Sequence, residues 1–335
     1  MIFVNQITEV LVAVQRVGIC GTDLEIWQQA GYHGDPINHT VPGHECSGIV
    51  HKVGKDVTAI KKGDRVAVFP VIKCGTCNLC TNGHGDVILC NGFKCLSLTN
   101  YQYGGMMRYL VHPENLVFRI PDNVSFEEGA IVEPLSVTLR ACMKANIRKG
   151  DNVLIGGAGP IGICAMLNAK QQGASNVCIV DKNELRLDLA KKMGATMTYR
   201  VPPSDDVSLA TRDLIALMGR RPDHAIETTG VQYPINLCID AVEKGGYVVL
   251  VGLAEQHVTI NAVDVVMRDI KVCGCVGPVE RFPEVIEMIS NGQIDVKPLI
   301  THHFGLTEVQ KAFELCERKE GMKIMIDCAN DAITN

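Results

Sequence analysis

The sequence predicts an α/β protein in which a doubly wound parallel-sheet domain is joined to a second domain that is irregular and mostly β. Two observations lead to this class. Up to about residue 130, short β-like runs such as VLVAVQRVGIC and DRVAVFP are broken by Gly, Pro and Asn, which is typical of an antiparallel β domain. From Lys149 onward, strand-like and helix-like segments alternate, which indicates a parallel sheet covered on both faces.

The alternation after Lys149 can be followed element by element. We expect a strand over 151–157, a helix over 160–173, a strand over 176–181 and a helix over 183–194. Segments 224–230, 235–246 and 247–252 continue the pattern. Near the end of the chain we expect a helix over 283–292, an extended segment, a helix over 307–321 and a final strand over 322–328.

Composition excludes several classes of function. The 335 residues are enough for two domains, and 47% hydrophobic with 21% charged residues is typical of a globular chain. The net charge is −5 and no basic tract occurs, so neither nucleic acid nor a membrane is expected as a partner. Without a secretory leader or an apolar run of spanning length, we expect a cytoplasmic location. In that reducing compartment, 15 cysteines spread through apolar segments indicate buried thiols and metal ligands rather than disulfides.

A glycine pattern opens the expected helix at 160–173. Gly157, Gly159 and Gly162 form G-x-G-x-x-G between a strand and a helix, and the next strand ends in Asp181. This context is typical of a Rossmann-type dinucleotide site, in which the pyrophosphate lies at the helix N-terminus. A carboxylate at the strand end can accept the ribose hydroxyls and repels a 2′-phosphate, so NAD is favoured over NADP, although basic residues follow at Lys182 and Arg186. The alternative is an ordinary glycine turn with a surface aspartate.

A second motif, KCGTCNLC, contains closely spaced cysteines. Cys74, Cys77 and Cys80 are followed by Cys90, and four thiolates at such spacings predict a closed, tetrahedral structural zinc site. The alternative is a set of unrelated buried thiols. His84 and Cys95 compete with Cys90 for the fourth position, because Cys₃His sites are also stable.

Two further stretches leave their chemistry open. In VGICGTDLEIW, Cys20 is a packing residue, a redox thiol or a metal ligand. In VPGHECSGIV, His44 and Glu45 are neighbours, and adjacent side chains on a strand point to opposite faces. Both could therefore reach one metal only from a bend, for which Gly43 supplies the flexibility.

Taken in order, the motifs GICGTD, GHE, the cysteine lobe, VEPLSV, GAGPIG and IVD resemble the zinc-dependent medium-chain dehydrogenases. Two long stretches, LVHPENLVFRIPDNVSFEEGAIVEPLSV and VKPLITHHFGLTEVQKAFELCERKEGMKIMIDC, resemble the sorbitol and polyol dehydrogenase branch. The resemblance covers nearly the whole chain. It implies a GroES-like catalytic domain over 1–135 and 276–335, with a zinc lobe at about 73–95, and an NAD-binding Rossmann domain over 136–275.

The resemblance also implies site residues. It makes Cys20, His44 and Glu45 ligands of a catalytic zinc, with Asp23 orienting His44. Glu133 matches a fourth ligand, but a thiolate and two carboxylates would weaken Zn²⁺ as a Lewis acid, so we expect it at or beyond the edge of the shell. Thr22 is expected to pass the substrate proton outward. The coenzyme residues are expected to be Gly157, Gly159, Pro160, Ile161, Gly162, Asp181, Lys182, Arg186, Val251, Gly252, Leu253 and Cys275.

The resemblance implies zinc- and NAD-dependent oxidation of a secondary alcohol, a polyol or sugar-derived alcohol, by a homodimer or homotetramer. Threonine- and butanediol-type dehydrogenases are alternatives within the class, and a catalytically weak NAD-binding sensor is the alternative outside it. Three departures bear on this. Glu25 and Ile26 replace the His and Tyr of polyol dehydrogenases, and the gap between Cys80 and Cys90 is longer than in relatives. The chain also starts almost at the usual second strand, so we expect an exposed sheet edge there.

Overall fold

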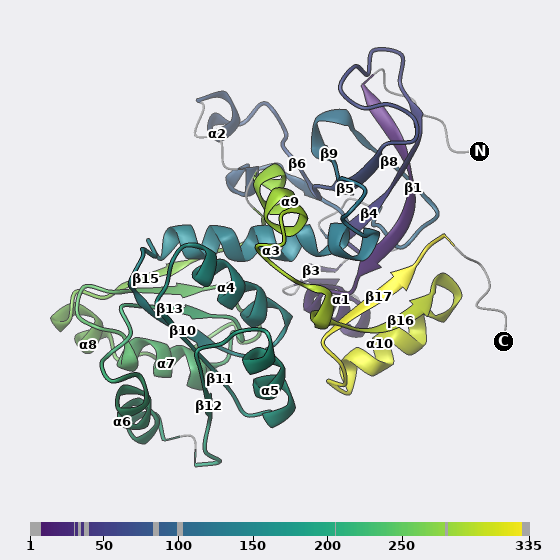
Figure 1. Cartoon of the computed structure of the whole chain (residues 1–335). Coiled ribbons are helices and arrows are strands. Elements are labelled where there is room, and N and C mark those ends of the chain that lie inside the picture. Colours follow the sequence, from purple (N-terminus) through teal and green to yellow (C-terminus); the bar gives the residue numbers. More distant parts are fainter. Residues whose placement is uncertain are drawn as a thin grey trace. The chain divides into compact units, whose positions relative to one another are not determined.

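The computed structural model describes residues 8–29, 31–32, 35–36, 40–82, 87–98, 103–204, 206–278 and 281–329. The chain divides into two units, Met1–Ser136 with Val279–Asn335, and Val137–Pro278 (Figure 1). The predicted fold class is confirmed, because the first unit is built on a mainly antiparallel sheet and the second on a parallel one.

The first unit contains a seven-stranded sheet in the order β16-β17-β1-β4-β5-β9, and β8 also pairs with β1. Its strands are β1 (Glu9–Gly18), β4 (Glu45–Val53), β5 (Arg65–Val68), β8 (Tyr109–Pro113), β9 (Val117–Arg119), β16 (Ile300–Gly305) and β17 (Lys323–Asp327). The expected exposed edge at the first strand is wrong, because β1 pairs with β4 as well as with β8 and β17. Two small two-stranded sheets pair β2 (Gly31–Tyr32) with β3 (Asp35–Pro36) and β6 (Val71–Ile72) with β7 (Lys94–Cys95), both antiparallel.

Short helices complete this unit. They are α1 (Gly21–Gln29), α2 (Asn78–Thr81), α9 (Phe282–Ser290) and α10 (Val309–Glu317), with 3₁₀ turns at Val87–Leu89, Glu114–Leu116, Lys297–Leu299 and Leu306–Glu308. Trp27 of α1 stacks on Phe313 of α10, with ring centroids 5.5 Å apart. The last expected helix, over 307–321, is shorter than expected at both ends: a 3₁₀ turn replaces its first residues, and α10 ends at Glu317.

One long helix, α3 (Phe126–Lys144), was not expected from the β-like texture of this region. Its start is fixed by a capping box, in which the Ser125 hydroxyl accepts the Glu128 N–H at 3.2 Å and the Glu128 carboxylate accepts the Ser125 N–H at 2.8 Å. Pro134 lies inside the helix, where it supplies no backbone donor. The N-terminal cap and the burial of the helix therefore outweigh Pro134, which by itself would indicate a break in the helix.

The second unit is a parallel sheet in the order β12-β11-β10-β13-β14-β15. The strands are β10 (Asn152–Gly156), β11 (Asn176–Asp181), β12 (Met197–Arg200), β13 (His224–Glu227), β14 (Tyr247–Leu250) and β15 (Lys271–Gly274). The helices are α4 (Pro160–Gln171), α5 (Glu184–Lys192), α6 (Val207–Met218), α7 (Gln232–Ala241) and α8 (Ala262–Met267). Helices α4 and α5 cover one face of the sheet and α6 and α7 the other (Figure 1).

The order of the strands positions a ligand site. The chain leaves β10 toward β11 and β12 and then returns to the other side of β10 at β13, so the connections diverge between β10 and β13. In open parallel sheets, ligands bind outside the carboxyl ends of the strands at such a switch point. Gly156 and Glu227 are in register there, one at the end of each strand. Among the described residues, no helix is both long and apolar enough to span a membrane.

Burial of His112 predicts a pH-dependent stability. His112 is fully buried on β8; its Nε2–H donates to the Phe69 carbonyl at 2.8 Å, and its Nδ1 has no partner in the described part of the chain. Burial lowers the pKa of His112 from 6.5 to about 4. The unfolded chain therefore takes up a proton first as the pH falls, so the free energy of unfolding should decrease between pH 6.5 and about 4.

This contribution should amount to about 3 kcal/mol over that interval. Urea unfolding of the wild type and of His112→Gln at several pH values measures it, because the glutamine cannot take up the proton. The variant should lose clearly less stability than the wild type as the pH falls. Equal losses in both proteins would mean that His112 is not the responsible group.

Candidate functional site

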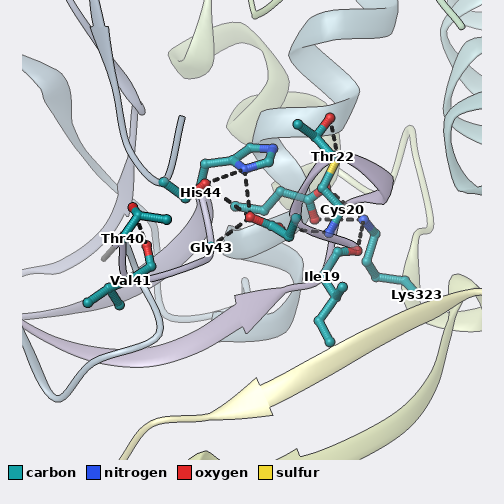
Figure 2. Close-up of polar contacts among 11 residues, drawn as sticks. Ile19, Cys20, Thr22, Thr40, Val41, Gly43, His44 and Lys323 are labelled. Atoms are coloured by element: carbon teal, nitrogen blue, oxygen red, sulfur yellow. Dashed lines mark hydrogen bonds and ion pairs between the residues drawn. The ribbon is translucent and has the colours of Figure 1, made fainter. Parts of the chain in front are cut away.

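Cys20, His44 and Glu45 come together in the first unit. One potential ligand atom from each lies within 4.8 Å of those of the other two. Figure 2 labels Cys20 and His44 of this group. The antiparallel pairing of β1 and β4 places Gly18 opposite Glu45, so Cys20, just beyond β1, is brought to the start of β4. Gly43 has a φ of +96°, and this left-handed residue supplies the bend from which His44 and Glu45 can face one point. A Cβ on Gly18 would lie 2.2 Å from Glu45 Oε2, so a larger residue there would displace the Glu45 carboxylate.

Asp23 organises this cluster from α1. Its buried carboxylate accepts the N–H groups of Cys20 at 3.1 Å and Gly43 at 2.9 Å, and the Ser97 hydroxyl at 3.0 Å. It also lies 3.4 Å from His44 Nδ1, which orients the imidazole and leaves Nε2 for a ligand. Burial opposes the charge of Asp23, but His44 and the backbone donors hold the pKa of Asp23 below its usual value.

Lys323 is the partner of Glu45 that sequence reasoning missed. This lysine of β17 is 2% exposed, and its Nζ lies 2.7 Å from each oxygen of Glu45 and 3.1 Å from the Ile19 carbonyl (Figure 2). The one available signal is a lysine directly before the apolar run IMI at the start of β17, where a buried charge needs a partner. Ser97 gave no such signal, because a single serine in a loop is ordinary.

The donor set fits a zinc ion. A thiolate, an imidazole and a carboxylate are ligands that catalytic zinc sites use, with a fourth position left for water or substrate. Glu133 of α3 is buried, but it is not a member of the close group in the described part of the chain. Burial raises the pKa of Glu133 to about 7, and the charge of Glu45 acts in the same direction. Thr22 Oγ1 lies 3.7 Å from the Cys20 sulfur.

A second cluster contains Cys74, Cys77, Cys80 and Cys90, whose sulfur atoms all lie within 4.8 Å of one another. The Cys77 and Cys80 sulfurs are 3.5 Å apart, and the Cys90 sulfur accepts the Cys74 N–H at 3.2 Å. Backbone donors from Thr76 and Cys77 lower the pKa of Cys74 to about 5. Backbone donors also lower the pKa of Cys77, and four converging thiols, two of which have a lowered pKa, fit a closed zinc site.

The competitors for the fourth position can be placed in part. Cys95 is buried on β7 and is not one of the four clustered cysteines, and burial raises its pKa to about 12. Its thiol is therefore the neutral form that suits packing. His84 lies outside the described residues.

The glycine motif lies at the end of β10 in the second unit. Gly157 has a φ of +99°, Gly159 caps α4, and Pro160 is the first residue of that helix. A Cβ on Gly162 would lie 1.8 Å from the Gly157 carbonyl oxygen, so only glycine allows the turn to pack this closely. Open N–H groups at the start of α4 suit a pyrophosphate.

The other predicted coenzyme residues surround the same edge of the sheet. Asp181 ends β11 and accepts the N–H groups of Ala158 and Asn183, each at 2.8 Å, so it also fixes the glycine turn. Val251, Gly252 and Leu253 follow β14, and Cys275 follows β15 with its sulfur 3.9 Å from the Val137 carbonyl oxygen. The Lys182 ammonium lies 5.7 Å from the centre of the Tyr233 ring. Arg186 and Ile161 are on α5 and α4.

Comparison with known proteins identifies the class. Residues 6–122 match the family model of the alcohol dehydrogenase GroES-like domain, and residues 160–291 match that of the zinc-binding dehydrogenases. The chain is 38% identical to sorbitol dehydrogenase of Gallus gallus over 322 residues, which are 96% of this chain and 89% of that protein. It is 37% identical to L-idonate 5-dehydrogenase of Vitis vinifera over 326 residues, 95% and 88% of the two chains.

Among solved structures, an Escherichia coli oxidoreductase of unknown specificity superimposes with a TM-score of 0.89 at 32% identity, over 97% of this chain and 93% of that one. The fold and the relatives together define an oxidoreductase of the zinc-binding dehydrogenase class. More narrowly, the chain belongs to the medium-chain dehydrogenase family, in which its relatives include the sorbitol dehydrogenases.

Proposed function

We propose that this chain oxidises a secondary alcohol, a polyol or sugar-derived alcohol, to the ketone with NAD and a catalytic zinc. The observation that carries the proposal is the convergence of Cys20, His44 and Glu45, three ligands that suit an open zinc site. The identities to sorbitol and L-idonate dehydrogenases support this substrate class.

Zinc held by these three residues would supply a Lewis acid that lowers the pKa of the alcohol hydroxyl. The chain's own residues prepare the site for it. Lys323 offsets the charge of Glu45, so Cys20, Glu45 and Lys323 together bring a net charge near −1 rather than −2. Asp23 holds the His44 ring and the backbone of Cys20 in place. The Thr22 hydroxyl, beside the Cys20 sulfur, can accept the substrate proton while passing its own outward.

In the second unit, the glycine turn and the Asp181 carboxylate would hold NAD, which supplies the hydride acceptor. Glu133 would lie at or beyond the edge of the zinc coordination shell. The four-cysteine lobe would hold a second, structural zinc. Homodimers or homotetramers would cover the outer edge of β15, which is the last strand of the sheet in the described part of the chain, and the exposed apolar residues Val263, Val266, Met267 and Val276.

The test of this function is NADH formation by the zinc-loaded enzyme with a panel of alcohols. Sorbitol, xylitol and L-idonate represent the proposed class, and threonine and 2,3-butanediol represent the alternatives. We expect kcat/KM for a polyol or sugar acid to be at least tenfold higher than for threonine or butanediol. NADH binding without turnover of any alcohol would favour the sensor function instead.

Coenzyme choice gives a separate prediction. Asp181→Ala should narrow the preference for NAD over NADP by about tenfold in kcat/KM, because the carboxylate no longer repels a 2′-phosphate. Since Asp181 also holds the Ala158 N–H, the KM values for both coenzymes should rise, and only their ratio reports specificity.

The control for this prediction is Asp188→Ala, which removes an exposed carboxylate from α5 and should leave the ratio unchanged. If wild-type enzyme uses NAD and NADP equally well, then Lys182 or Arg186 dominates, and Asp181 does not determine the choice.

A further inference from the structure

Three loops interlock at the carboxyl edge of the parallel sheet in the second unit. They are the glycine turn 157–162 after β10, the turn 228–230 after β13 and the loop 251–254 after β14. The Thr228 hydroxyl lies 2.7 Å from the Gly156 carbonyl oxygen at the end of β10 and 3.4 Å from that of Gly157, which ties the second loop to the first. A Cβ on Gly252 would lie 1.9 Å from the Gly230 nitrogen, so the second and third loops touch backbone to backbone. A displacement of turn 228–230 would therefore move both of its neighbours.

The carboxylate of Glu227 holds that turn. Glu227 ends β13 and is completely buried. Its Oε1 accepts the Thr229 N–H at 2.7 Å and the Thr229 hydroxyl at 2.5 Å, and its Oε2 accepts the Gly230 N–H at 2.9 Å. The backbone carbonyl of the same residue accepts the N–H groups of Val251 at 2.8 Å and Gly252 at 3.2 Å.

A buried carboxylate is costly unless its charge is compensated. Burial raises the pKa of Glu227, and the donors of Thr229 and Gly230 act in the opposite direction. In the part of the chain that the structure describes, no basic side chain forms an ion pair with Glu227. Three hydrogen bonds from turn 228–230 therefore compensate the buried charge of Glu227. To accept all three, Glu227 uses both of its carboxylate oxygens. An apolar residue at the end of β13 would be buried at a lower free-energy cost than a carboxylate. The buried carboxylate of Glu227 therefore indicates a role other than packing.

We propose that Glu227 is a positioning residue for the coenzyme. Its carboxylate fixes turn 228–230. Turn 228–230 then holds the glycine turn 157–162 and the loop 251–254 in the geometry that receives the dinucleotide. Gly156 and Glu227 are in register at the switch point of the sheet, where such a ligand binds. The inference rests on the proposed function, because it assumes that this unit binds NAD.

Glu227→Gln tests the role. The amide keeps the size of the side chain but replaces one acceptor oxygen by an NH₂ group, which would face an N–H donor. In the zinc-loaded enzyme, we expect the Kd of NADH, measured by coenzyme fluorescence, to rise at least tenfold. The KM for NAD should rise with it, while the KM for the alcohol and the zinc content stay at wild-type values, since both zinc clusters lie in the other unit.

Asp223→Asn is the matched control. Asp223 precedes the other end of β13, where it accepts the Asn152 N–H at 2.7 Å and forms a two-point ion pair with Arg220. Its substitution should lower the melting temperature but leave the Kd of NADH unchanged. A purely structural role for Glu227 predicts that both variants lose stability and that neither loses coenzyme affinity.

Thr229→Val is a milder variant in case Glu227→Gln does not fold. It removes one donor to the carboxylate and should weaken NADH binding several-fold, whereas Thr229→Ser should bind as the wild type does. Wild-type NADH affinity in both Glu227→Gln and Thr229→Val would overturn the proposal. If the wild type itself does not bind NADH, the proposed function fails, and this outcome is distinct from the first.

Discussion

Replacing Cys20 by serine should remove one zinc per chain and abolish alcohol oxidation. The Cys20 sulfur is one of three converging atoms that could hold a metal ion, and serine is a poor replacement because its hydroxyl stays protonated at neutral pH. Loss of the Lewis acid should cost several kcal/mol in the barrier, which corresponds to a decrease in kcat of roughly a thousandfold or more. Zinc analysis by mass spectrometry and steady-state kinetics on the same sample measure both effects.

The position of the cluster supplies the controls. NADH binding should survive in Cys20→Ser, because the glycine turn lies in the other unit. Cys316→Ser removes a partly buried thiol of α10 that belongs to neither cysteine-containing cluster, and it should keep both zinc ions and full turnover. Turnover of Cys20→Ser at a tenth of the wild-type rate or better would be incompatible with a catalytic zinc at this position.

Replacing Cys90 by serine should lower the zinc content by about one per chain and lower the melting temperature. The lobe around Cys74, Cys77 and Cys80 has little core of its own, since α2 within it contains no buried residue. Folding of the lobe is therefore coupled to metal binding, and a loss of several kcal/mol is expected when the metal is lost. Zinc analysis and differential scanning calorimetry test this result.

Measurements of alcohol oxidation distinguish the proposed catalytic zinc site from the proposed structural one. For each correctly folded Cys90→Ser molecule that carries catalytic zinc, turnover should fall far less than in Cys20→Ser. Cys95→Ser is the matched control, because this buried thiol lies in the same lobe but outside the cluster of four. If Cys95→Ser or His84→Ala loses a zinc while Cys90→Ser keeps two, the fourth ligand is not Cys90.

Much of the second unit could be predicted because its signals are local. Expected strands over 151–157 and 176–181 correspond to β10 and β11, and the expected helix over 160–173 corresponds to α4. The expected helix over 235–246 is displaced: α7 spans Gln232–Ala241 and ends before the GG turn. Strand β12 and helix α6 were not expected. Strand β12 is only partly buried, so its alternation of apolar and polar residues is weak.

By itself, the sequence determined the two-domain α/β class, the glycine turn and the cysteine cluster. These features depend on residues that are close along the chain, such as Gly157, whose positive φ a turn requires, or Cys74 and Cys77, whose spacing suits one metal ion. Only the tertiary structure decided that Lys323 pairs with Glu45 and that Ser97 donates to Asp23. Lys323 reaches Glu45 across 278 residues because β17 pairs with β1, and Ser97 reaches Asp23 across 74. Periodicity identifies strands and helices but not their distant partners, so the contact of Lys323 with Glu45 follows from strand order and register.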